Sequence, residues 1–237
     1  MSGLPVLPPT LRELIATQFA FLAFRPVRIN VREHFWRWFL FVLAVTWIAG
    51  VGRYWDHPAA HAWQYAGLGS VAYLFCLSTL LFLVVWPLKP RNWSWRGVLV
   101  FVGLTSLPAL LYAIPIERFT DLEAAQAVNA WFLGIVAVWR VALLARYLAT
   151  AADLQWPCVL IVMLLLLSGI VFSLAMLNLE HVVFDLMAGI RESDASPNDT
   201  AYAIVFMLGA LSTLVFPVAL LSYLGAIVWR FRAAKLR

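Results

Sequence analysis

Six long apolar runs, each near the length at which a helix crosses a lipid bilayer, constrain this sequence more than any other feature. The purest run follows Pro157 and reads CVLIVMLLLLSGIVFSLAML, without one charged residue. Of the 237 residues, 64% are hydrophobic and 12% are charged, whereas about 25% of the residues in a soluble domain are charged. Too few polar residues remain to cover a water-facing surface. The sequence therefore predicts an all-α, polytopic membrane bundle with about six transmembrane helices.

The chain divides into three predicted parts. Residues 1–34 form a cytoplasmic N-terminal segment, residues 35–229 hold the spans, and residues 230–237 are a basic cytoplasmic tail. The connections between spans are too short for a separate soluble domain. In chain order, we predict the six spans at residues 35–54, 63–86, 98–116, 124–147, 158–177 and 201–229.

The third span is unusual because it has two prolines, Pro108 and Pro115, and ends on Glu117 and Arg118. Proline removes a backbone N–H and its ring clashes with the preceding turn, so we expect a kink at Pro108. In lipid, such a break is tolerated where neighbouring helices or water satisfy the freed carbonyls. Two or three spans lie on either side along the chain, so we expect this span in the middle of the bundle. The sixth span is long enough to tilt or to kink at Pro217.

A short amphipathic segment precedes the first span. Thr10 is a predicted N-cap with Glu13 three residues later, which is the capping-box spacing. The apolar segment 10–24 is too short to span a bilayer, so we expect it to lie in the membrane interface. Pro26 ends it. The basic residues that accompany and follow it are suited to anionic lipid headgroups: Arg25, Arg28, Arg32 and Arg37.

The distribution of cations predicts the topology. Of the 17 Lys and Arg residues, all except Arg53, Arg118 and Arg191 fall on one side if the N-terminus is cytoplasmic and there are six spans. The positive-inside rule predicts this asymmetry. We therefore expect both termini in the cytoplasm, and most acidic residues on the outer face.

Histidines and acids recur at the predicted outer ends of spans. Imidazole and carboxylate groups suit zinc, and a zinc ion with an open position activates water. If the first, third and fifth spans end close together, these groups would converge on a metal. The alternative is that they are ordinary polar residues at helix ends, solvated by headgroups and water. The candidate ligands are His57, His61, Glu117, Glu180, His181 and Asp185.

Arg140 lies about two turns inside the cytoplasmic end of the fourth span. Its long side chain can reach the interface while its stem stays in the apolar region. The other interpretation is an anchor for a lipid phosphate or a carboxylate, because an intramembrane cation is costly unless it has a partner.

The features from Lys89 to Phe172 resemble those of bacterial members of the Yip family of small multi-spanning membrane proteins. A basic loop precedes a span with the core Thr105-Ser106-Leu107-Pro108, and a span opened by Trp131 and a very apolar span follow. The resemblance implies a helical bundle in a bacterial inner membrane. Eukaryotic relatives act as binding partners in vesicle traffic. The resemblance therefore implies a binding role, and no catalysed reaction is known for the family. Two features differ from the family: six spans are predicted here instead of five, and the acidic Tyr-Gly-Pro motif of eukaryotic members is missing.

Three function classes remain open. A P-loop, a G-x-S-x-G elbow and a nucleic-acid motif are all missing from the sequence. The leading hypothesis is a non-enzymatic membrane protein without a cofactor, which binds lipid, a partner protein or a second copy of itself, and no nucleic acid. The alternative is a metal-dependent membrane enzyme with zinc on the outer face. The third is a small-solute transporter, although its usual intramembrane acids are missing.

Overall fold

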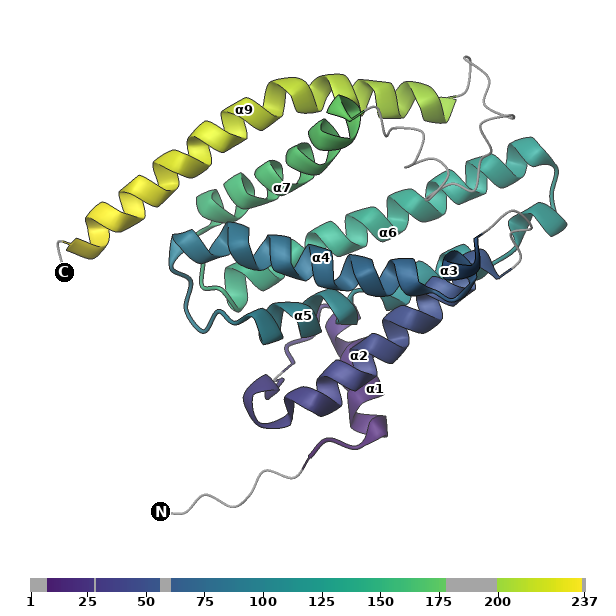
Figure 1. Cartoon of the computed structure of the whole chain (residues 1–237), viewed down its shortest axis with the longest axis horizontal. Coiled ribbons are helices and arrows are strands. Elements are labelled where there is room, and N and C mark those ends of the chain that lie inside the picture. Colours follow the sequence, from purple (N-terminus) through teal and green to yellow (C-terminus); the bar gives the residue numbers. More distant parts are fainter. Residues whose placement is uncertain (1–7, 28, 56–60, 178–199, 236–237) are drawn as a thin grey trace. The chain divides into compact units, whose positions relative to one another are not determined.

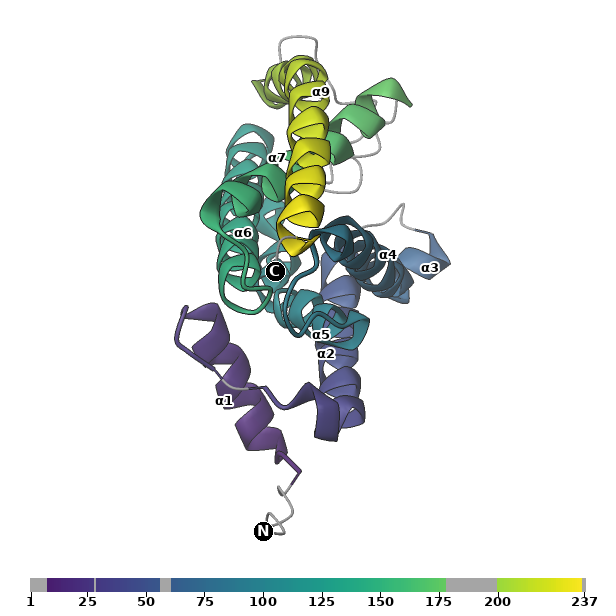
Figure 2. The same ribbon diagram turned by 90° about the vertical axis from the view of Figure 1, so that its left-hand side faces the viewer.

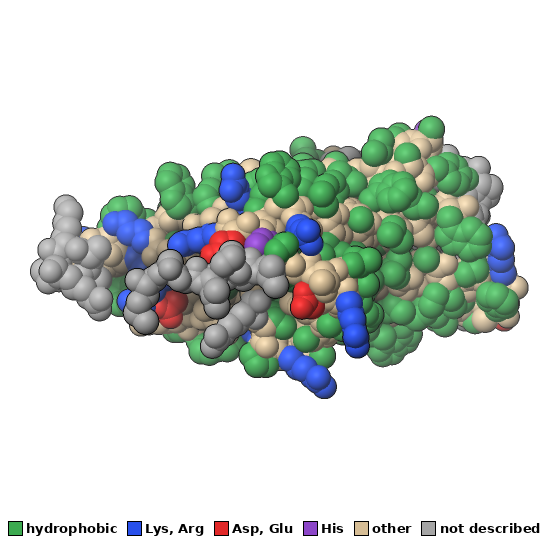
Figure 3. Space-filling view, turned by 90° about the horizontal axis from the view of Figure 1, so that it is seen from below, with side chains coloured by type: hydrophobic (Ala, Val, Ile, Leu, Met, Phe, Trp, Pro, Cys, Tyr) green, Lys and Arg blue, Asp and Glu red, His purple; other side chains and the backbone are tan. Residues whose placement is uncertain are grey.

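The computed structural model describes residues 8–27, 29–55, 61–177 and 200–235, and over these residues it is all-helical (Figure 1). Six helical segments are long and apolar enough to cross a membrane, and hydrophobic side chains cover much of the surface in view (Figure 3). The predicted fold class is therefore confirmed: this is a multi-pass helical membrane protein. The six segments are Val31–Tyr54, Leu68–Leu88, Trp95–Ala113, Ala127–Thr150, Trp156–Met176 and Met207–Arg232.

The chain forms two compact units. The N-terminal unit comprises Met1–Phe82 and Ser94–Ala113, and the C-terminal unit comprises Leu83–Trp93 and Ile114–Arg237. The N-terminal unit contains α1 (Leu11–Leu22), α2 (Val31–Tyr54), α3 (Ala62–Tyr65), most of α4 (Leu68–Val85), α5 (Trp95–Leu104) and the 3-10 helix η2 (Leu107–Ala113). The C-terminal unit contains the end of α4, η1 (Trp86–Leu88), η3 (Ile116–Arg118), α6 (Leu122–Thr150), α7 (Trp156–Met176) and α9 (Thr200–Lys235).

In the N-terminal unit, α2 and the third span run side by side in the same direction. The Arg96 guanidinium carbon lies 4.9 Å from the centre of the Phe35 ring near their starts. Near their ends, the indole nitrogen of Trp55 donates to the carbonyl oxygen of Ala113 (3.0 Å). Between these points the backbones approach closely, because a Cβ added to Gly103 would lie 2.4 Å from the Cβ of Val42. The third span is also the most buried of the six.

The third span is a broken helix. After α5 ends at Leu104, a turn at Thr105 and Ser106 leads into η2. The predicted kink at Pro108 is confirmed, and it begins three residues earlier, because the proline disrupts the turn that precedes it. A 3-10 helix rises about 2.0 Å per residue, whereas an α-helix rises about 1.5 Å per residue. Segment 106–113 therefore spans about the same axial length as segment 46–55 of α2, although it has fewer residues.

The first two spans begin differently from each other. A kink at His34 (φ −121°, ψ 35°) interrupts the first turn of α2, so the regular helix starts at Phe35, as predicted. The predicted start of the second span at residue 63 is wrong, because α3 and α4 are separate helices. Gly67 joins them with φ +66°, and a Cβ there would lie 2.9 Å from the backbone nitrogen of Val51. The span therefore begins at Leu68.

In the C-terminal unit, α7 and α9 lie side by side (Figures 1 and 2). The rings of Phe172 and Phe216 stack between them with their centres 4.9 Å apart, and Gly169 leaves space beside Phe216. The helix α9 continues through Pro217 and bends along its length (Figure 1). The sequence predicts a tilt or a kink in this span, and the structure has a bent but continuous helix.

Candidate membrane-surface site around the N-terminal helix

The helix α1 begins with the predicted capping box. The Glu13 backbone N–H donates to the hydroxyl oxygen of Thr10 (3.3 Å), and the Thr10 N–H donates to the Glu13 carboxylate (2.7 Å). Hydrogen bonding of the Glu13 carboxylate by the Thr10 backbone, and then by the Thr10 side chain, lowers the pKa of Glu13. The capping box satisfies backbone donors that the first turn of a helix leaves without partners. It fixes the start of α1 at Leu11.

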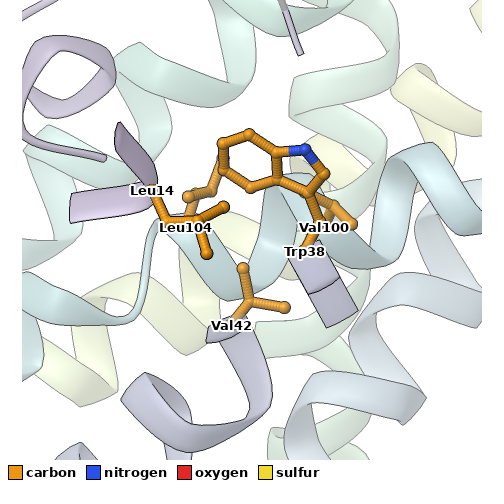
Figure 4. Close-up of a cluster of buried hydrophobic side chains, with 5 residues drawn as sticks. All are labelled: Leu14, Trp38, Val42, Val100 and Leu104. Atoms are coloured by element: carbon orange, nitrogen blue, oxygen red, sulfur yellow. The ribbon is translucent and has the colours of Figure 1, made fainter. Parts of the chain in front are cut away.

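One face of α1 packs against α2 and α5. Leu14, Gln18 and Leu22 recur at every fourth position and are all buried. Figure 4 shows Leu14 of α1 in one cluster with side chains from α2 and α5. Phe21 adds an edge-to-face contact with Phe101 of α5, with the ring centres 5.9 Å apart. The other members of the cluster in Figure 4 are Trp38, Val42, Val100 and Leu104.

Gln18 connects α1 to the break in the third span. Its side-chain nitrogen donates to the carbonyl oxygen of Leu104 (3.2 Å), and the side chain is only 3% exposed. In a continuous α-helix this carbonyl would accept the N–H of residue 108, but Pro108 has no N–H. A side chain from outside the span therefore satisfies the carbonyl that the proline frees.

The two polar residues of the break, Thr105 and Ser106, also find partners, although both are buried. The Thr105 hydroxyl donates to the carbonyl oxygen of Val102 (2.7 Å). The hydroxyl of Thr46 in α2 donates to the hydroxyl oxygen of Ser106 (2.9 Å). Three elements, α1, α2 and the span itself, thus supply the hydrogen bonds that a membrane would not supply.

A second side of α1 is apolar and exposed. Leu11, Ile15 and Phe19 recur at every fourth position, and their exposed fractions are 66%, 42% and 59%. Arg12, also exposed, follows Leu11 on this side of the helix. The helix runs across α2 and not alongside it (Figures 1 and 2). An apolar side next to cations, on a helix that crosses the direction of a span, is typical of helices in the membrane interface.

The predicted headgroup-binding arginines differ in their surroundings. Arg25 and Arg32 are exposed, whereas Arg37 donates from its guanidinium to the carbonyl oxygen of Pro9 (2.9 Å), just before α1. Arg28 lies outside the described residues. Arg140 belongs to α6 in the C-terminal unit, where it is half-buried within the span Ala127–Thr150. Its role as a phosphate anchor stays a prediction.

Sequence reasoning missed two contributors to this site. Arg96 lies near the start of α5 and its guanidinium covers the Phe35 ring, which places a further cation beside the start of α2. Gln18 was missed as well, although a single amide among apolar residues at helical spacing is a usable signal. A polar group on a buried face needs a hydrogen-bond partner, and that partner is often distant in the sequence.

The candidate zinc ligands are largely beyond what the structure describes. His57, Glu180, His181 and Asp185 fall outside the described residues. Glu117 lies in η3, but its side chain is also not described. His61 is exposed at the start of α3, where its backbone N–H donates to the side-chain oxygen of Gln64 (2.7 Å). Within the described part of the chain, no group of three His, Cys, Asp or Glu residues gathers. Convergence on zinc stays a prediction.

Comparisons with known proteins add no relative: no family model, no curated protein and no solved structure matches this chain. The resemblance to the Yip family stays a prediction that rests on the residues between Lys89 and Phe172.

Proposed function

We propose that this protein is a non-enzymatic, multi-pass protein of a bacterial inner membrane, which binds anionic lipid headgroups on the cytoplasmic leaflet through α1 and the neighbouring arginines. The apolar side of α1 enters the boundary between headgroups and acyl chains. The arginines then lie at the level of the phosphates, where a cation near an anionic surface contributes about 1 kcal/mol.

One observation carries this proposal: α1 keeps an apolar, exposed side while its other side is packed. Exposure of these apolar side chains, those of Leu11, Ile15 and Phe19, to water would be unfavourable. With Arg12, Arg25 and Arg32 exposed nearby in the chain, a lipid surface satisfies both the apolar and the charged side chains. A protein partner or a second copy of the chain would also need a complementary acidic surface. The lipid explanation needs only an anionic leaflet.

The cation distribution supports the orientation in this proposal. The basic residues around α1, between the second and third spans, and after the sixth span all fall on one predicted side. Reporter fusions after Lys89 and at the C-terminus should be active only as cytoplasmic reporters, and a fusion after Asp194 only as an external reporter. A C-terminus outside the membrane would contradict the orientation.

The lipid proposal is tested on the purified full chain in neutral detergent. Titration with phosphatidylglycerol should raise the melting temperature, titration with phosphatidylcholine should raise it less, and added salt should reduce the difference. In the variant with Arg12→Gln, Arg25→Gln and Arg32→Gln, the apparent affinity for phosphatidylglycerol should fall about a hundredfold, at about 1 kcal/mol for each cation.

Arg118→Gln is the matched control, because Arg118 lies on the predicted outer face, and it should keep the wild-type response. Equal responses to the two lipids in the wild type, or a wild-type response in the triple variant, would refute binding of anionic headgroups at α1.

A further inference from the structure

We propose that anionic lipid bound at α1 stabilises the broken form of the third span, so that the lipid surface and the interior of the N-terminal unit are energetically coupled. This inference rests on the lipid binding proposed above. It goes further because it assigns a consequence to that binding, and because it gives Gln18 a part in lipid response although this residue is too buried to touch lipid.

The first step is the dependence of the break on α1. The Leu104 carbonyl receives its hydrogen bond from Gln18, a residue 86 positions away in the chain. A buried carbonyl without a donor is unfavourable by the full cost of its desolvation. Displacement of α1 would leave this carbonyl without that donor in an apolar region, so the broken form is favoured when α1 is docked.

The second step is that docking and lipid binding use different sides of α1. Leu14, Gln18 and Leu22 face the unit, whereas Ile15 and Phe19 remain exposed. Lipid on the exposed side does not displace the buried side, so both contacts form together. A bilayer that holds α1 with its exposed side in the acyl region also holds Gln18 toward the third span.

The third step is the reciprocity of linked equilibria. If lipid binding favours docking of α1, then docking of α1 favours lipid binding by the same factor, and a change that weakens docking lowers the apparent lipid affinity by up to that factor. Gln18 provides a direct test of this reciprocity. Its loss removes no cation and no exposed apolar side chain, so any effect on lipid affinity passes through the docked state.

The experiment uses the full chain in nanodiscs of phosphatidylcholine alone or mixed with phosphatidylglycerol, with hydrogen exchange measured over residues 105–113. In the wild type, phosphatidylglycerol should slow exchange in this segment. In Gln18→Leu, exchange should be faster and should no longer respond to phosphatidylglycerol. The apparent phosphatidylglycerol affinity of this variant should fall about three- to tenfold, the factor that one hydrogen bond contributes to an equilibrium.

Gln155→Leu is the matched control, because Gln155 is exposed before α7 and its side chain makes no capping hydrogen bond. It should behave as the wild type. A second variant, Pro108→Ala, restores a backbone donor for the Leu104 carbonyl. It should remove the lipid effect on exchange even if Gln18→Leu fails to fold.

The outcomes separate the two proposals. A wild type whose melting temperature does not respond to phosphatidylglycerol would refute lipid binding, and the coupling with it. A wild type that responds in melting temperature, but whose exchange over residues 105–113 is unchanged by phosphatidylglycerol, would refute the coupling alone. Wild-type lipid affinity in a folded Gln18→Leu variant would do the same.

Discussion

Pro108 and Pro217 occupy comparable positions inside long apolar spans, yet the chain responds differently to them. At Pro108 the α-helix stops and a 3-10 helix follows, whereas α9 remains helical through Pro217. The surroundings differ accordingly. Buried polar side chains from α1 and α2 meet the break near Pro108, while Pro217 and the following Val218 are exposed. The break at Pro108 thus coincides with side-chain donors from neighbouring helices.

The end of α4 in the C-terminal unit also lies next to a proline and receives side-chain hydrogen bonds. Pro87 follows α4 directly, and the chain continues as the 3-10 helix η1. Here the hydroxyl of Tyr223 donates to the carbonyl oxygen of Val84 (2.6 Å), and the Arg230 guanidinium donates to that of Leu88 (3.0 Å). Both donors come from α9. At this proline, as at Pro108, side chains from another helix donate to carbonyls at the end of an α-helix.

The largest effect is expected from Gly103→Ala, which separates α2 from α5 beside the break. The added Cβ would lie 2.4 Å from the Cβ of Val42, so the helices must move apart and the hydrogen bond from Thr46 to Ser106 must weaken. Overpacking of this kind costs about 1–3 kcal/mol, and the lost hydrogen bond adds about 1 kcal/mol. Thermal unfolding of the purified protein measures the loss.

Gly134→Ala in α6 is the matched control, because nothing lies within 4 Å of the added Cβ. Its stability should equal or exceed that of the wild type, since alanine is the better helix former. Equal losses in the two glycine variants would show that close approach at Gly103 does not matter.

An intermediate effect is expected from Gln18→Leu, with a loss of about 1–3 kcal/mol from the unsatisfied Leu104 carbonyl. The informative measurement is a double-mutant cycle with Pro108→Ala. In the Pro108→Ala background, residue 108 donates its own N–H to Leu104, so Gln18→Leu should cost less than in the wild type. Additive losses would show that Gln18 does not act through the proline break.

The smallest effect is expected from Pro217→Ala, within about 0.5 kcal/mol of the wild type, as for other exposed substitutions. Helical segments persist in the unfolded state of a membrane protein, so the local cost of this proline is present before and after unfolding. Unfolding in mixed micelles measures the difference. A large gain in stability would mean that Pro217 strains the packing of α9 on α7.

The sequence by itself determined the properties that depend on local composition. Six spans, an all-helical fold, the capping box of Thr10 and Glu13, and a disturbance at Pro108 were all predicted, and the structure confirms them. Each of these depends on residues within about 20 positions of one another, and the transfer of a segment into lipid depends on that segment's own side chains.

Only the tertiary structure decided how the segments pair. The donor from Gln18 to Leu104, the close approach of Gly103 to Val42 and the start of the second span at Leu68 all depend on helices that are distant in the sequence or separated by a turn. Hydropathy does not encode these pairs, because lipid favours every apolar face alike. What selects the arrangement is the fit of small residues and the need of each buried polar group for a partner, and both are properties of the packed helices.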